Sequence, residues 1–185
     1  MRILLVYGTT EGQTRKIAGF VADHLSNRGH QARVVDALEA TAELDPDEFD
    51  AVIIAASVHA GRYQSAIVDF VSRNLAAIDR RANAFLSVSL SAAGGDEDDA
   101  EGIRQCVAAF TRQTGWRPGM IHPVAGAFRY TAYDFLKRWA MKYLAYRKGA
   151  PTDTSRDHEL TDWADLARFV DAFLKCSERG RGAAA

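Results

Sequence analysis

The most constraining feature of the chain is an apolar run that passes directly into a loop of glycines and threonines. Residues 2–7 read Arg-Ile-Leu-Leu-Val-Tyr, and residues 8–14 read Gly-Thr-Thr-Glu-Gly-Gln-Thr. From Arg15 onward, apolar residues recur at helical spacing. A helix N-terminus presents unpaired backbone N–H groups and a partial positive charge. The sequence therefore predicts a phosphate-binding loop between a strand and a helix.

The residue types in this loop suit phosphate. The threonine hydroxyls can donate hydrogen bonds, and Gly8 and Gly12 allow the backbone to turn and approach closely. The Lys-Ser or Lys-Thr pair of a P-loop is absent, as is the G-x-G-x-x-G dinucleotide pattern. An ordinary turn is the alternative, but turn chemistry does not require three threonines at this spacing. The predicted cofactor contacts here are Thr9, Thr10, Glu11, Gly12, Gln13 and Thr14.

Strand and helix patterns alternate along the chain, and the strands are continuous apolar runs, as expected for strands buried on both faces. The predicted strands are 2–7, 31–36, 50–56, 83–90 and 120–127, and the predicted helices are 13–28, 64–80, 98–115 and 160–176. This pattern predicts an α/β fold, a doubly wound parallel sheet in the order 2-1-3-4-5. Its ligand crevice would lie at the carboxyl ends of strands one and three.

The whole-chain properties indicate one globular domain. The chain has 185 residues, of which 48% are hydrophobic and 25% are charged, with a net charge of -1. We expect Cys106 and Cys176 to be small core residues in a reducing compartment, and we expect no metal site. The N-terminal run reads as a core strand and not as a signal peptide, and no apolar run is long enough to span a bilayer. We therefore expect a cytoplasmic protein.

The phosphate loop closely resembles the FMN phosphate loop of the flavodoxins. The resemblance is carried by Leu5, Val6, Tyr7, Thr9, Gly12, Thr14 and Ala18. It implies FMN as the cofactor, with two further loops on either side of its isoalloxazine ring. The implied contacts are Ser57, Val58, His59, Ala60, Gly61 and Tyr63 in the first ring loop, and Ser89, Leu90, Ser91, Ala92 and Gly94 in the second.

Three departures distinguish this sequence from an electron-shuttling flavodoxin. The second ring loop lacks an aromatic residue, the first contains His59 and Arg62, and the net charge is close to neutral. Positive charge near the ring would stabilise a reduced flavin and suit two-electron oxidation of a substrate. A surface position for Arg62 is the alternative. The acidic run 96–99 is either a docking patch for a redox partner or the start of a helix.

Between the last strand and the last helix lies a long insertion, 129–160. From Arg129 to Lys148 it has six basic residues and one acidic residue, and apolar residues recur at helical spacing. Such a helix could face anionic lipid, line a cleft for a large apolar molecule with carboxylates, or pack on the domain with its charges solvated. Nucleic-acid binding is disfavoured because no recognition motif accompanies the charge. The candidate substrate or membrane contacts are Arg129, Tyr130, Lys137, Arg138, Trp139 and Lys142.

Together these segments resemble the menaquinone-dependent protoporphyrinogen IX dehydrogenases, flavodoxin-like enzymes of bacterial haem synthesis. The resemblance lies in residues 10–15, 56–57, 61–66, 116–118, 124–130, 152–154 and 161–163. It implies a flavodoxin-like domain over 1–177 with a helical insertion. The composition of the tail at 178–185 predicts disorder. It also implies FMN-dependent removal of six electrons and six protons from protoporphyrinogen IX, with menaquinone or ubiquinone as acceptor at the membrane surface.

Several points stay open at this stage. The sequence identifies no catalytic base, and a homo-oligomer is possible. The alternative function is a flavodoxin-type electron carrier or regulatory protein whose insertion docks a protein partner.

Overall fold

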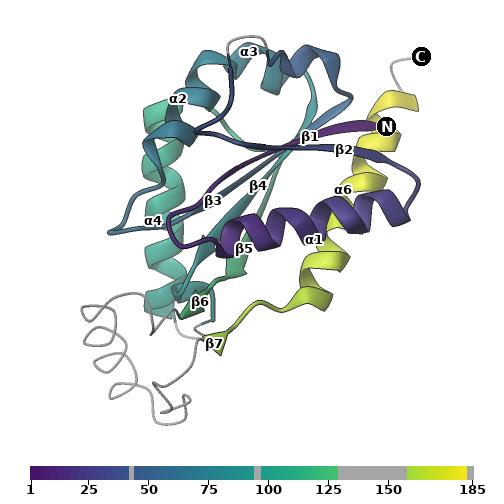
Figure 1. Cartoon of the computed structure of the whole chain (residues 1–185). Coiled ribbons are helices and arrows are strands. Elements are labelled where there is room, and N and C mark those ends of the chain that lie inside the picture. The colour runs from purple at the N-terminus through teal and green to yellow at the C-terminus, as the bar shows by residue number, and fades with distance from the viewer. Residues whose placement is uncertain (42–43, 94–96, 129–157, 183–185) are drawn as a thin grey trace.

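A five-stranded parallel sheet forms the centre of the molecule (Figure 1). The computed structural model describes residues 1–41, 44–93, 97–128 and 158–182. The strands are β1 (Arg2–Gly8), β2 (Gln31–Asp36), β3 (Ala51–Ser57), β4 (Ala82–Ser89) and β5 (Met120–Ala125). Their order is β2-β1-β3-β4-β5. The predicted doubly wound sheet is therefore confirmed.

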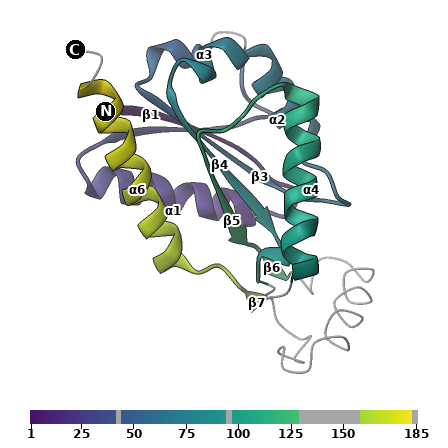
Figure 2. The same cartoon turned by 180° about the vertical axis from the view of Figure 1, so that it is seen from behind.

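Helices cover both faces of this sheet (Figures 1 and 2). One face carries α1 (Gln13–Asn27) and α6 (Trp163–Gly182), and the other carries α2 (Ser65–Arg73), α3 (Leu75–Asp79) and α4 (Glu97–Thr114). Two short 3-10 turns, η1 (Pro46–Glu48) and η2 (Ser91–Ala93), lie in the connections. The chain thus crosses from one face to the other as the order of the strands requires.

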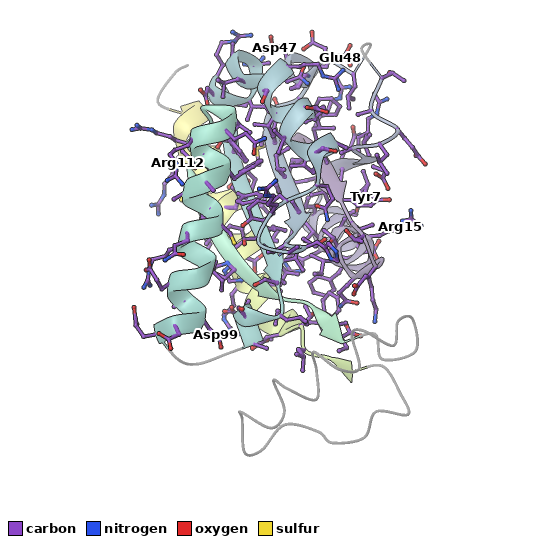
Figure 3. The ribbon with its side chains drawn as sticks, turned by 90° about the vertical axis from the view of Figure 1, so that its left-hand side faces the viewer. Tyr7, Arg15, Asp47, Glu48, Asp99 and Arg112 are labelled. Atoms are coloured by element: carbon purple, nitrogen blue, oxygen red, sulfur yellow. The ribbon has the colours of Figure 1, made fainter. Side chains whose placement is uncertain are left out.

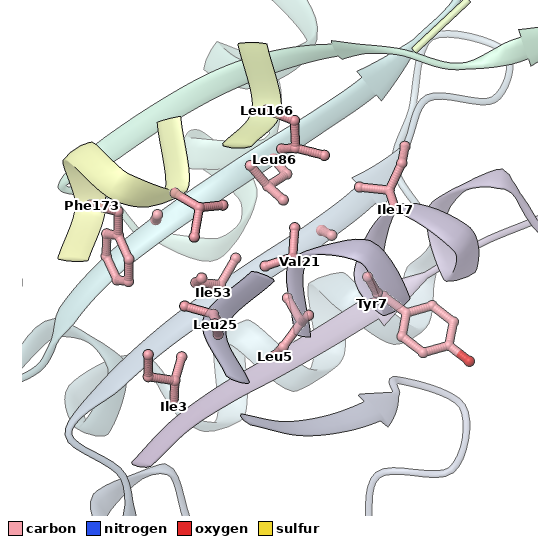
Figure 4. Close-up of a cluster of buried hydrophobic side chains, with 14 of the residues drawn as sticks. Ile3, Leu5, Tyr7, Ile17, Val21, Leu25, Ile53, Leu86, Leu166 and Phe173 are labelled. Atoms are coloured by element: carbon pink, nitrogen blue, oxygen red, sulfur yellow. The ribbon is translucent and has the colours of Figure 1, made fainter. Parts of the chain in front are cut away.

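Strand β1 shows why the apolar runs are continuous. Ile3 and Leu5 point into the core under α1 and α6, whereas Leu4 and Val6 point into the core under α2 and α4. All four side chains are fully buried. Figure 4 shows the first of these cores, where Val21 of α1 packs near the β1 side chains. Burial on both faces removes the polar alternation of a one-sided sheet.

Apart from the last helix, two elements differ from the prediction by more than one residue at an end. The predicted helix 64–80 is split, because Asn74 lies between α2 and α3 and its side-chain amide donates to the Phe70 carbonyl oxygen at 2.9 Å. The predicted strand 120–127 ends at Ala125. A second, antiparallel sheet follows, in which β6 (Ala127–Phe128) pairs with β7 (His158–Glu159). Apolar residues continue from the end of β5 into β6, so the sequence pattern cannot reveal the change of partner strand.

The C-terminal helix is longer than expected. Asp162 caps its start, since its Oδ1 accepts from the Asp165 backbone N–H at 2.9 Å. The helix continues through Gly182. Ser177 is buried and donates to the Phe173 carbonyl oxygen at 2.8 Å, which keeps the helix packed at the point where the sequence turns polar. The expectation of disorder from Glu178 was therefore wrong for residues 178–182.

A buried aromatic cluster lies on the α2 and α4 face. Tyr63 packs edge-on against Phe85 and Phe110, with ring centroids 5.1 Å apart in both pairs. Its hydroxyl is 2.7 Å from the Ser87 Oγ, and burial raises the pKa of Tyr63 to about 12. The Tyr63 side chain therefore lies in the core, and its contact with a flavin ring stays a prediction. Tyr63 follows Gly61 closely in sequence, but the chain turns into the core immediately after the loop at Gly61.

Tyr63→Phe should lower the free energy of unfolding by about 1 kcal/mol, because it leaves the buried Ser87 hydroxyl without its partner. Denaturant unfolding measures this loss. The double variant Tyr63→Phe/Ser87→Ala should be no less stable than Tyr63→Phe alone, because both partners are then removed. FMN affinity should stay unchanged in each variant. A large loss of FMN affinity with unchanged stability would return Tyr63 to the ligand site.

Candidate functional site

Three loops at the carboxyl edge of the sheet surround one cavity of about 440 Å³. They follow β1, β3 and β4, which are adjacent strands. The residues that line it are Thr9, Thr10, Glu11, Gln13, Thr14, Ser57, Val58, His59, Ala60, Gly61, Val88, Ser89, Leu90, Ser91, Gly102, Cys106, Gly126 and Ala127. The structure thus brings together most of the residues that the sequence predicted as cofactor contacts.

The loop after β1 presents hydrogen-bond donors that have no acceptor within the loop or the helix. Gly12, with φ of 88°, makes the left-handed turn that starts α1, and its N–H donates to the Thr9 Oγ1 at 2.8 Å. The first N–H groups of the helix have no intrahelical acceptor. Thr14 lies within this turn, is fully buried, and its Oγ1 has no hydrogen-bond partner. A buried hydroxyl without a partner is unfavourable by about 1–3 kcal/mol, so its placement fits a ligand oxygen.

Basic side chains near this loop are engaged elsewhere. The Arg15 Nε donates to the Tyr7 hydroxyl at 2.9 Å, and its guanidinium lies 3.6 Å from the Asp36 carboxylate (Figure 3). Lys16 pairs with Glu159. No lysine or arginine is among the described residues that line the cavity. A phosphate here would be held by backbone N–H groups and hydroxyls, in agreement with the sequence prediction.

The loop after β3 is a tight reversal. The backbones of His59 and Arg62 exchange two hydrogen bonds, at 2.8 and 3.1 Å. Ala60 and Gly61 lie between them with φ of 49° and 76°. A left-handed alanine costs about 1–2 kcal/mol, so neighbouring contacts must hold this turn. His59 lines the cavity, whereas Arg62 is exposed and does not, which favours the surface alternative for Arg62.

The loop after β4 supplies small and apolar walls. The Ser89 Oγ accepts from the Ala92 N–H at 3.2 Å, and this bond fixes the turn into η2. Ser89, Leu90 and Ser91 line the cavity, but Ala92 does not, and Gly94 lies outside the described residues. The lining residues that the structure describes include no phenylalanine, tyrosine or tryptophan. This agrees with the absence of an aromatic residue from the second ring loop.

Helix α4 contributes a wall that the sequence did not predict. Cys106 is half-buried, and its Sγ donates to the Gly61 carbonyl oxygen at 3.5 Å. Burial raises the pKa of the Cys106 thiol. Gly102 lies one turn earlier and lines the same cavity. Cys106 also packs against the buried core under α2 and α4, so its expected core position is confirmed in part, whereas the expectation was wrong for Cys176, which is exposed. Helical periodicity alone does not say which loop a helix will face.

Residues 97–99 of the acidic run are part of the same helix. Helix α4 begins at Glu97, and Asp99 lies at this end (Figure 3). Arg104 pairs with Glu97 and Glu101 at 2.5 and 2.8 Å. Carboxylates in a first turn complement the helix dipole. These contacts favour the helix-start alternative over a docking patch.

The flanks of the insertion meet beside the cavity. Gly126 and Ala127 line it, and the Gly126 carbonyl oxygen accepts from the Leu160 N–H at 3.1 Å. Thr161 donates to the Ala125 carbonyl oxygen at 2.7 Å and accepts from the Gln13 Nε2 at 3.0 Å. These bonds join the flanks to the start of α1. The candidate contacts Arg129, Tyr130, Lys137, Arg138, Trp139 and Lys142 lie outside the described residues.

Comparison with known proteins identifies the family. The flavodoxin domain family matches residues 4–155. The protoporphyrinogen IX dehydrogenase [quinone] of Escherichia coli is 32% identical over 170 residues, which span 92% of this chain and 93% of that protein. The Leishmania major protein of the same name is 28% identical over 173 residues, 93% of this chain and 74% of that protein. The chain belongs to the quinone-dependent protoporphyrinogen IX dehydrogenase family.

This family is one of oxidoreductases on a flavodoxin domain. The flavodoxin likeness also appears in the fold. Oxidised flavodoxin 1 from Bacillus cereus superposes with a TM-score of 0.56 at 13% identity, covering 95% of this chain and 98% of that chain. Within the described part of the chain, no helix is long and apolar enough to cross a membrane. No group of three or more metal-ligating side chains is found there either.

Thr14→Val should have opposite effects on the two states of the protein. It should weaken FMN binding by about 1–3 kcal/mol, because a phosphate oxygen loses a donor. It should also stabilise the apoprotein, because a buried unpaired hydroxyl is replaced by a methyl group of similar size. FMN fluorescence titration and denaturant unfolding measure the two effects, with Thr111→Val on α4 as the control. Unchanged FMN affinity would remove Thr14 from the site.

Proposed function

We propose that this chain oxidises protoporphyrinogen IX to protoporphyrin IX with bound FMN and passes the electrons to a membrane quinone. Each porphyrinogen loses six electrons and six protons, and three quinones are reduced to three quinols. The observation that carries this proposal is the combination of near full-length similarity to the Escherichia coli dehydrogenase with a cavity built for a phosphorylated ligand. The role in haem synthesis belongs to the same proposal.

The described residues fit FMN. The start of α1 and the hydroxyls of Thr9, Thr10 and Thr14 would hold the phosphate, and the loops after β3 and β4 would hold the ring. When bound, FMN supplies the acceptance and donation of hydride or electrons. The chain then has to bind the substrate beside the flavin, exclude water and set the redox potential.

The cavity walls suit that task. Val58, Leu90 and Ala127 are apolar, and the described lining includes no aromatic side chain that would cover a flavin face. A second ring system could therefore approach the flavin. His59 is the one basic residue among the described lining residues. In its protonated form it would favour negative charge on a reduced flavin, and thereby a higher potential.

Purified protein with bound FMN should convert protoporphyrinogen IX to porphyrin under anaerobic conditions beyond the amount that its own FMN can oxidise only when a quinone is added. Porphyrin fluorescence measures the product, and the apoprotein is the control. The rate should exceed the uncatalysed rate by orders of magnitude, as enzymes typically do. Porphyrin formation at the uncatalysed rate, with FMN bound, would reject this function and leave an electron carrier as the alternative.

The sequence of the insertion supplies the substrate and membrane contacts of this proposal. Arg129 and neighbouring lysines would pair with the propionates of the porphyrinogen, and the basic amphipathic pattern would contact anionic lipid, where the quinone is dissolved. The flanks of the insertion support this role, because β6 and β7 pair beside the cavity. Peripheral attachment to the cytoplasmic face of the membrane follows from this proposal.

Charge reversal at Lys137, Arg138 and Lys142 should reduce binding to anionic liposomes, because each basic residue near the surface contributes about 1 kcal/mol of attraction. Co-sedimentation with phosphatidylserine vesicles measures this binding. FMN content should stay unchanged. Reversal of Arg73, Arg80 and Arg112, on described parts of the domain outside the cavity lining, is the matched control. An equal loss of vesicle binding in both triple variants would contradict a specific role for the insertion.

A further inference from the structure

The side chain of Gln64 connects two of the loops around the cavity. Its Nε2 donates to the Thr10 Oγ1 at 3.1 Å, in the loop after β1, and to the Ser57 Oγ at 2.6 Å, at the end of β3. Thr10 and Ser57 both line the cavity, whereas Gln64 is not among the described lining residues. One amide group thus reaches the phosphate end and the ring end of the site.

These contacts do not serve the helix that Gln64 precedes. Gln64 occupies the N-cap position of α2 but makes no side-chain capping hydrogen bond. Its Oε1 is buried and has no hydrogen-bond partner. The amide therefore keeps an unsatisfied oxygen while its nitrogen contacts both hydroxyls, an arrangement that a purely structural role does not require.

Gly8 leaves the space that this amide occupies. A Cβ at Gly8 would lie 3.0 Å from the Gln64 Oε1 and 2.6 Å from the Ile67 Cγ1. The end of β1 and the start of α2 therefore fit together only with a glycine at this position. Packing against β1 holds the amide in place without a hydrogen bond to its oxygen.

The direction of the two hydrogen bonds determines what the hydroxyls can offer a ligand. A hydroxyl that accepts from an N–H keeps its own proton for another acceptor. Phosphate oxygens, flavin carbonyl oxygens and flavin ring nitrogens are acceptors. We propose that Gln64 is a positioning residue that makes Thr10 and Ser57 hydrogen-bond donors toward FMN. This inference rests on FMN as the cofactor in the proposed function.

Gln64→Glu tests the direction of these bonds with almost no change in shape. A carboxylate only accepts, so both hydroxyls would turn their protons toward Glu and away from FMN. We expect the Kd for FMN to rise about tenfold or more. Gln64→Met fills similar space without fixing the direction of either hydroxyl, so its loss of FMN affinity should be smaller than that of Gln64→Glu. Gln31→Glu, exposed at the amino end of β2, is the control for one added negative charge.

Titrations with riboflavin, which lacks the phosphate, separate charge repulsion from donor loss. Gln64→Glu should weaken riboflavin as well as FMN, because Ser57 also loses its proton toward the ligand. Unchanged FMN affinity in Gln64→Glu, or equal losses in Gln64→Met and Gln64→Glu, would overturn the proposal. An effect on FMN with none on riboflavin would assign the loss to repulsion of the phosphate and would also overturn it.

Apoprotein unfolding should change little among these variants. The titrations do not depend on turnover, so they test Gln64 whether or not protoporphyrinogen is the substrate. Failure of the wild-type chain to bind FMN at all would instead reject the proposed function.

Discussion

The unpaired groups at the start of α1 are the constraint on which the rest of the site depends. A parallel strand leads into a left-handed turn at Gly12, and the helix then begins with free N–H groups and the unpartnered Thr14 hydroxyl. Burial of such donors is unfavourable unless an anion accepts from them. The strand order places this turn beside the loops after β3 and β4. A phosphorylated cofactor therefore has one natural position in the fold.

A second set of contacts ties the far end of the chain to the same turn. Gln13, the first residue of α1, donates to Thr161, and Lys16 pairs with Glu159. Thr161 in turn donates to the last residue of β5, Ala125. The strands on either side of the insertion are therefore anchored where the cofactor phosphate would bind. The two flanks of the insertion therefore lie beside the cavity.

The elements that local patterns determine were predictable. The β1 run, the loop to Thr14 and the strand order follow from apolar patterning, helix-start chemistry and the rules for parallel sheets. The loops at Val58 and Ser89 were also placed correctly at the cavity. Each of these features depends on residues adjacent in sequence or on a general topological rule.

The features set by tertiary contacts were not predictable. Tyr63 turns into the aromatic core, and Cys106 faces the cavity because α4 packs beside the loop at Gly61. Gln64 joins the loop at Thr10, 54 residues earlier in the chain, to Ser57, 7 residues earlier. The polar residues after Cys176 gave no indication that α6 continues and buries Ser177. In each case a nonlocal neighbour decides the position, and a single sequence does not name that neighbour.

The two half-reactions of the bound flavin test the central claim most directly. FMN-loaded protein is mixed anaerobically with protoporphyrinogen IX without quinone, and the flavin absorbance is followed in a stopped-flow instrument. A quinone is added in a second mixing step. We expect the porphyrinogen to bleach the flavin as porphyrin forms, and the flavin absorbance to return when the quinone is added. A flavin that stays oxidised in the presence of the porphyrinogen would contradict the account.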